Sequence, residues 1–261
     1  MAFTYLCAPF SVSAQSADSL AMEALRLERE IFVAPSATEA NCAILAKAEV
    51  RKQQGLYADA ASELARVSPW ALTAEQSETY YHQKALCLYL AGDFDGALAT
   101  IDEAQLYLPQ NSPTLHEFLL IDALASGEKG EWARSKKAAE AYLHNAPQEI
   151  KAKIAELYDS APKLRNPMTA WYLSLVPGLG QFYAGEVWSG VVSLAVNGGI
   201  IAFGVGEVIA AHWLSAWLGA CGMLSTTYFV GQERAKILTE RRNTRVLRNH
   251  NDLLREALLQ E

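Results

Sequence analysis

The 64 residues from Met168 to Gly231 contain no Lys or Arg, and Glu186 and Glu207 are their only acidic residues. A soluble domain needs charged side chains on its surface, whereas a cation at mid-bilayer costs about 2.5 to 3.5 kcal/mol, so this pattern favours a membrane block. The other charges of the 261-residue chain, whose net charge is −7, lie before and after it. We therefore expect a soluble module, a membrane domain at residues 163–231 and a charged tail at residues 232–261. The alternative is the buried core of a large soluble helical protein.

Three apolar stretches divide this block. The first, Met168–Tyr183, is interrupted by a Pro-Gly-Leu-Gly turn and has only 16 residues, so we expect a re-entrant or interfacial segment. The second and third, Val187–Val205 and Val208–Val230, have 19 and 23 residues, and both are predicted to span a bilayer because a span needs about 20. The block therefore predicts two or three apolar helices.

Residues 1–14 are predicted to be a signal peptide whose start is truncated. Val12 and Ala14 fit the −3 and −1 positions of a cleavage site before Gln15. The usual basic segment is missing from the start of this stretch, so an ordinary chain terminus is the alternative.

Residues 15–162 carry apolar side chains at helical spacing, with no sustained alternation of period two, which predicts an all-α module. Short breakers separate the helices, and the glycines among them include Gly55, Gly127 and Gly130. The expected helices cover residues 18–32, 39–54, 57–67, 75–90, 95–108, 114–125, 131–145 and 149–158.

One pattern recurs in this module at intervals of 37 and 38 residues. Each unit has a glycine, an aromatic residue two positions later, a small residue three positions further on and another apolar or small residue four after that. We expect the glycine to end the preceding helix in the left-handed conformation, and the small residue to let two helices approach closely. The three units are Gly55-Tyr57-Ala60-Leu64, Gly92-Phe94-Ala97-Ile101 and Gly130-Trp132-Ser135-Ala139.

This pattern resembles the tetratricopeptide repeat (TPR) over about residues 41–147, although the period is longer and the family's Trp-Leu-Gly signature is degraded. The resemblance implies a solenoid of helical hairpins whose concave groove binds a protein or peptide. A generic helical bundle is the alternative. By position in the repeat, the groove residues would be Glu49, Lys52, Gln53, His82, Tyr89 and Glu117. A solvated helix face is the alternative interpretation of these six residues.

A second motif lies at the start of the membrane block. It resembles the PGxGQxYxG motif of small bacterial membrane domains with two transmembrane helices, which also follow TPR-type helices in exported bacterial proteins. The resemblance implies a membrane hairpin and says little about activity. The residues that carry the motif, with the polar residue that follows it, are Pro177, Gly178, Gly180, Gln181, Tyr183, Gly185 and Asn197.

Residues 232–261 predict a basic amphipathic helix, with leucine pairs at 253–254 and 258–259. Its arginines at positions 241, 242, 245 and 248 are suited to lipid phosphates. The alternative is a soluble helix that packs on the repeats or forms a short coiled coil.

The sequence offers no catalytic constellation, no phosphate loop and no metal-ligand spacing, so we expect no enzyme, no cofactor and no metal site. The net charge of −7 argues against a nucleic-acid partner. The expected function is a scaffold at the bacterial inner membrane, with the repeats in the periplasm and bound to a protein or peptide. The alternatives are an accessory subunit of a transport or protein-insertion system and an unrecognised membrane enzyme.

Overall fold

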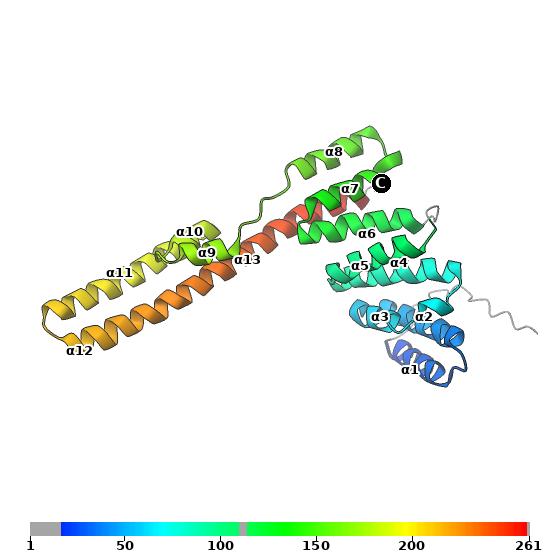
Figure 1. Cartoon of the computed structure of the whole chain (residues 1–261), viewed down its shortest axis with the longest axis horizontal. Helices are drawn as coiled ribbons and strands as arrows, with labels where there is room; N and C mark the ends of the chain where they lie inside the picture. Colours follow the sequence, from blue (N-terminus) through cyan, green and yellow to red (C-terminus); the bar gives the residue numbers. More distant parts are fainter. Residues whose placement is uncertain (1–16, 110–113, 260–261) are drawn as a thin grey trace, which may run out of the picture. The chain divides into compact units, whose positions relative to one another are not determined.

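A computed structural model describes residues 17–109 and 114–259, and throughout these ranges the regular structure is helical, with no β-strand (Figure 1). The predicted all-α fold class is confirmed. The α-helices of the first part are α1 (Ala17–Val33), α2 (Ala37–Gln53), α3 (Tyr57–Leu64), α4 (Ala74–Ala91), α5 (Phe94–Tyr107), α6 (Thr114–Lys129), α7 (Trp132–Tyr142) and α8 (Gln148–Asp159). Those of the second part are α9 (Pro167–Leu173), α10 (Leu179–Ala184), α11 (Val187–Ile209), α12 (Trp213–Ser215) and α13 (Gly222–Leu259). The predicted signal segment, residues 1–14, lies outside the described residues.

The chain forms two compact units. Unit 1 consists of Met1–Asp159 together with Leu254–Glu261, and unit 2 consists of Ser160–Leu253. Helix α13 therefore begins in unit 2, while its last turns belong to unit 1.

In unit 1 each helix from α1 to α8 packs on the next one along the chain, and α4 also packs on α6. Helix starts have identifiable caps: Ser36 accepts a hydrogen bond from the Glu39 backbone, and Thr73 and Gln76 form a reciprocal capping box at the start of α4. The largest buried side chains of the core include Leu64, Ile101 and Phe118.

The three repeat units have the same local geometry. Gly55, Gly92 and Gly130 all adopt positive φ, at 74°, 82° and 74°, which is why glycine occupies the position that follows each helix. The small residues five positions later, which are Ala60, Ala97 and Ser135, are fully buried between helices.

The prediction of a break at Gly127 is wrong. Helix α6 continues through this buried residue to Lys129, and the chain turns only at Gly130. Gly127 has ordinary helical backbone angles. The sequence alone does not distinguish a glycine inside a helix from one that ends it.

The end of α13 completes the core of unit 1. Leu254, Ala257 and Leu258 are buried in a cluster with Leu143 of the 3₁₀ turn after α7 and with Ile154 of α8. One leucine of each predicted pair, Leu254 and Leu258, therefore packs in this core, while Leu253 and Leu259 are exposed.

Unit 2 contains one helix that is long and apolar enough to cross a membrane, α11, judged by length and composition among the described residues. Helices α9 and α10 are short and separated by the Pro-Gly turn, in agreement with the predicted interruption of the first apolar stretch. Helix α10 packs on both α9 and α11.

The predicted third apolar span, Val208–Val230, has the wrong bounds. Val208 and Ile209 belong to α11, a tight turn follows in which Ala211 has a φ of 61°, and the next helix starts at Trp213. This helix runs through α12 and a π-helix at Ala216–Cys221 directly into α13. Residues 232–259 of the charged tail lie within α13, because the change in composition near residue 231 leaves the backbone helical.

Candidate functional site

Four of the six predicted groove residues lie in one charged surface on three helices of unit 1. Lys52 of α2 pairs with Glu49 of the same helix at 2.7 Å. His82 of α4 and Glu117 of α6 bridge neighbouring helices, with 3.0 Å between His82 Nε2 and Glu117 Oε2. His82 also stacks edge-on against the buried ring of Phe118, which fixes its position. The surface therefore presents both signs of charge, and Lys52 and Glu49 form an ion pair on it.

The charges of this surface act on two titratable groups of α4. Burial lowers the pKa of His82 below its ordinary value; Lys52 lowers it further, and Glu117 opposes the shift. Burial also raises the pKa of the Cys87 thiol. His82 is therefore neutral at pH 7, and Cys87 is an inert, protonated packing residue.

The other two predicted groove residues are placed differently. Gln53 is half-buried at the last position of α2. Tyr89 of α4 uses its hydroxyl to accept hydrogen bonds from Arg255 of α13, at 3.3 Å from Nε and 3.1 Å from a terminal nitrogen. Arg255 also pairs with Glu128 of α6 at 2.8 Å. The end of the chain thus occupies the part of the surface where Tyr89 lies.

Arg255 and Glu128 were missed by sequence reasoning. The leucine spacing around Arg255 indicated that the tail packs on something, but 166 residues separate it from Tyr89 and no periodicity relates the two.

In unit 2, the glycines of the PGxGQxYxG motif allow close crossings. A methyl group added at Gly180 would collide with Ala170 and Ser174 and come within 2.8 Å of the Ala235 methyl of α13. Gly178 has a φ of 91°, and a methyl group there would lie 2.7 Å from the carbonyl oxygen of Gly190. Only glycine fits at these two positions, so the motif locks α9, α10, α11 and α13 together.

The motif also supplies buried polar groups. Gln181 is 1% exposed and donates from Nε2 to the Gly231 carbonyl of α13 at 2.9 Å. Its Oε1 is buried and has no hydrogen-bond partner among the described residues. Asn197 of α11 accepts a hydrogen bond from the Thr227 hydroxyl of α13 at 2.9 Å, so it joins the two long helices. These polar residues line one small pocket that has no room for a water molecule, with Ser174 and Ser193 also in its wall.

Tyr183 and Gly185 lie at the other end of the motif, beside the chain segment that enters α9. The Tyr183 hydroxyl accepts from the Asn166 backbone at 3.2 Å, and its carbonyl accepts from the Arg165 guanidinium. The Asn243 amide of α13 then pairs with both backbone groups of Arg165, at 3.0 and 2.7 Å. These contacts fix the start of α9 on α13; Thr227 and Asn243, like Arg255, have no sequence signal that pairs them with the motif.

Among residues 17–109 and 114–259, no three His, Cys, Asp or Glu side chains are grouped so that they could hold a metal ion. Comparisons of the chain with protein families, with curated proteins and with solved structures find no match.

Proposed function

We propose that this protein is a membrane-anchored scaffold, in which a TPR-like solenoid in unit 1 binds a protein or peptide and unit 2 inserts into the bilayer as a helical hairpin. The observation that carries the proposal is the mixed-charge surface of Glu49, Lys52, His82 and Glu117, which spans the first helices of three consecutive repeat units. The equivalent glycines and buried small residues of the three units support the solenoid.

The expected partner is a polar segment with both acidic and basic groups. Lys52 and Glu49 are paired with each other, and Glu117 contacts the neutral His82. An extended peptide of mixed charge can therefore form ion pairs with both the basic and the acidic groups of this surface. The surface has no unpaired Lys or Arg cluster to hold a terminal carboxylate, and we expect recognition of an internal segment. The proposal assigns no chemical reaction and no cofactor to the chain.

The membrane part of the proposal rests on α11 and the apolar start of the helix that follows it. Large apolar side chains remain exposed along both, among them Ile201 and Phe203 of α11 and Phe229 of α13. A bilayer would cover this surface, which a soluble protein of this size leaves exposed only rarely. With the predicted signal peptide, the repeats would lie in the periplasm and unit 2 in the inner membrane.

The scaffold proposal is tested by site-specific photocrosslinking of the full chain in its own membranes. A photoreactive residue at position 53, beside the charged surface, is expected to give a discrete crosslinked band. The matched control is a photoreactive residue at Asp59, exposed on α3 in the other helix of the hairpin. Reversing two charges with Lys52→Glu and Glu117→Lys is expected to abolish the band at position 53. A crosslinking pattern that is the same at both positions and unchanged by the charge reversal would contradict the proposal.

The second candidate, an accessory subunit of a transport or insertion system, is favoured by the buried Gln181–Asn197–Thr227 polar cluster of unit 2. Polar groups inside a membrane domain are costly and are often functional. If this function holds, Asn197→Leu abolishes transport or insertion in cells, while the protein stays folded and still crosslinks to its partner. A scaffold tolerates the same substitution.

A further inference from the structure

The exposed face of α13 in unit 2 carries a row of arginines that nothing in the described chain neutralises. Arg234, Arg241, Arg245 and Arg248 are exposed, and no ion pair or hydrogen bond involves their side chains among residues 17–109 and 114–259. Of the six arginines of unit 1 within residues 17–159 and 254–259, all but Arg29 and Arg51 are ion-paired: Arg26, Arg66, Arg134 and Arg255. The four arginines of the α13 row are therefore available to a ligand outside the chain.

These arginines share one face because their spacings of 7, 11 and 14 residues are close to whole numbers of helical turns. Gln232, Ala235 and Thr239 are buried on the opposite face. Arg242, which the sequence grouped with the lipid-facing arginines, lies toward the packed side, where its Cδ and Nε would meet a methyl group added at Gly185. The outward row is therefore Arg234, Arg241, Arg245 and Arg248.

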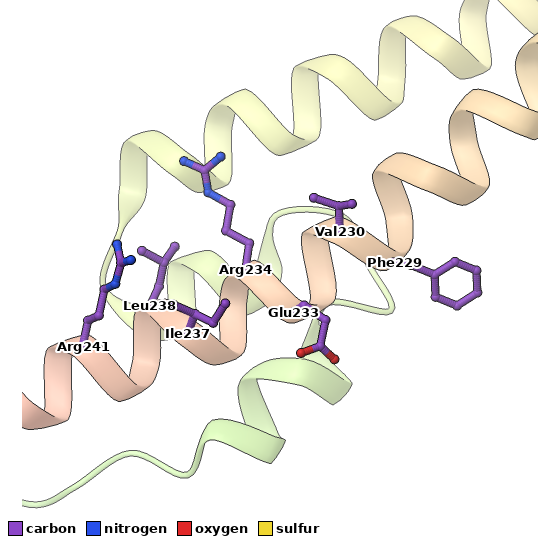
Figure 2. Close-up of a pocket in the computed structure, with 7 residues that line it drawn as sticks. All are labelled: Phe229, Val230, Glu233, Arg234, Ile237, Leu238 and Arg241. Atoms are coloured by element: carbon purple, nitrogen blue, oxygen red, sulfur yellow. The ribbon is translucent and has the colours of Figure 1, made fainter.

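A shallow, open surface pocket lies at the start of this row, and α13 alone lines it. Figure 2 shows Val230, Arg234, Leu238 and Arg241 projecting from the same side of the helix, while Glu233 points away from them. Glu233 also lines the pocket, and its carboxylate accepts a hydrogen bond from Trp171 of α9 at 3.1 Å. A second pocket continues the surface and shares Ile237 and Arg241 with the first.

The order of side chains along this face matches the depth profile of one lipid leaflet. Phe229 and Val230, 63% and 61% exposed, end the apolar part of the helix. Arg234 follows Val230 by about 6 Å and Arg241 follows by about 16 Å, at 1.5 Å per residue. The headgroup layer of a leaflet is only about 5 to 8 Å thick. Arg234 therefore reaches it directly and Arg241 reaches back through its long side chain, whereas Arg245 and Arg248 lie in the aqueous layer.

We propose that Arg234 and Arg241 form a binding site for the phosphate of an anionic phospholipid, with Val230 against the upper part of its acyl chains. The inference rests on the proposed insertion of unit 2 and adds the class of lipid that it binds. Arginine suits this role because its planar guanidinium donates paired hydrogen bonds to phosphate oxygens. Arg245 and Arg248 lie beyond the headgroups and contribute only a screened, longer-range attraction.

The test is a lipid titration of the full chain in neutral detergent. Dioleoyl phosphatidylglycerol and dioleoyl phosphatidylcholine are added separately, and bound lipid is counted by native mass spectrometry. The expected result is tighter binding of phosphatidylglycerol. Arg234→Gln with Arg241→Gln is expected to weaken it about thirtyfold, since each basic residue near an anionic surface contributes about 1 kcal/mol, or about fivefold.

The matched control is Arg245→Gln with Arg248→Gln, which removes the same charge from the same helix face. We expect this pair to weaken binding by less than about fivefold, because these arginines lie beyond the headgroups, where salt screens their attraction to the lipid phosphates. Unchanged far-UV circular dichroism and melting temperature establish that both variants fold.

Two results would overturn the site: an unmodified protein with no preference for phosphatidylglycerol, or equal losses in the two double variants. Carbonate extraction of membranes separates this failure from failure of the proposed function. If the chain resists extraction but shows no lipid preference, the result supports the membrane anchor and contradicts the lipid site. If the chain is released as a soluble protein, the result contradicts both.

Discussion

At the scale of single residues, the fit of glycine is the most demanding feature of unit 2. We predict that Gly180→Ala lowers stability by about 1 to 3 kcal/mol, because the added methyl group has no space between α9 and α13. Gly198→Ala in α11 is the control, since its methyl group meets nothing within 4 Å and alanine is favoured in a helix. Thermal unfolding of the full chain in detergent, followed by tryptophan fluorescence, measures both. Equal melting temperatures for wild type and Gly180→Ala would show that the crossing is looser than the structure indicates.

Glu28 of α1 makes unit 1 sensitive to acid. Hydrogen bonds from Arg66 and then from Lys47 lower the pKa of Glu28 to about 2 from the ordinary 4.5. Because the folded-state pKa is the lower one, this carboxylate stabilises the fold above about pH 4.5, and the contribution is lost as pH falls towards 2. We predict that Glu28→Gln flattens the fall in stability over this range in urea titrations of the full chain. The control is Glu75→Gln, an exposed carboxylate without an ion pair among the described residues, which is expected to keep the wild-type profile; identical profiles for the two variants would contradict the assignment.

At the scale of elements, the last turns of α13 act as a structural part of unit 1. Leu258 is 1% exposed in the cluster that contains Leu143 and Ile154, whereas the neighbouring Leu259 is 61% exposed. We predict that Leu258→Ala costs about 2 to 5 kcal/mol and that Leu259→Ala changes stability by less than about 0.5 kcal/mol. Chemical denaturation followed by far-UV circular dichroism checks both variants. If the two substitutions have equal effects, the tail is not part of the core.

The positions of individual helices were easier to predict from the sequence than the contacts between them. The helices of unit 1 were located because apolar periodicity and terminal glycines such as Gly55 and Gly92 act locally. The repeat register placed His82 and Glu117 on first helices, but the contact between them was not predicted. The break at Gly127 and the end of the second apolar stretch were misjudged, because local composition does not distinguish a helix interior from a cap. Contacts such as Arg255 with Tyr89 are set by tertiary packing, and no local pattern contains them.

At the scale of the whole molecule, unit 1 is a helical array, unit 2 has many exposed apolar side chains, and α13 has residues in both. In the proposed function, unit 1 presents its charges to water and α11 is surrounded by lipid. The proposal accounts for the separation of charged and apolar residues along the chain. The central claim is therefore that unit 2 is integrated in a bilayer.

Carbonate extraction of membranes from cells that produce the full chain tests this claim most directly. We predict that the wild-type protein stays in the membrane pellet. Leu194→Arg with Ile201→Arg, two exposed positions of α11, is expected to release it, at about 2.5 to 3.5 kcal/mol of insertion cost per arginine. Met22→Arg with Leu25→Arg, equally exposed apolar positions on α1, is expected to leave it in the pellet. A wild-type protein recovered in the supernatant as a soluble monomer would contradict the account.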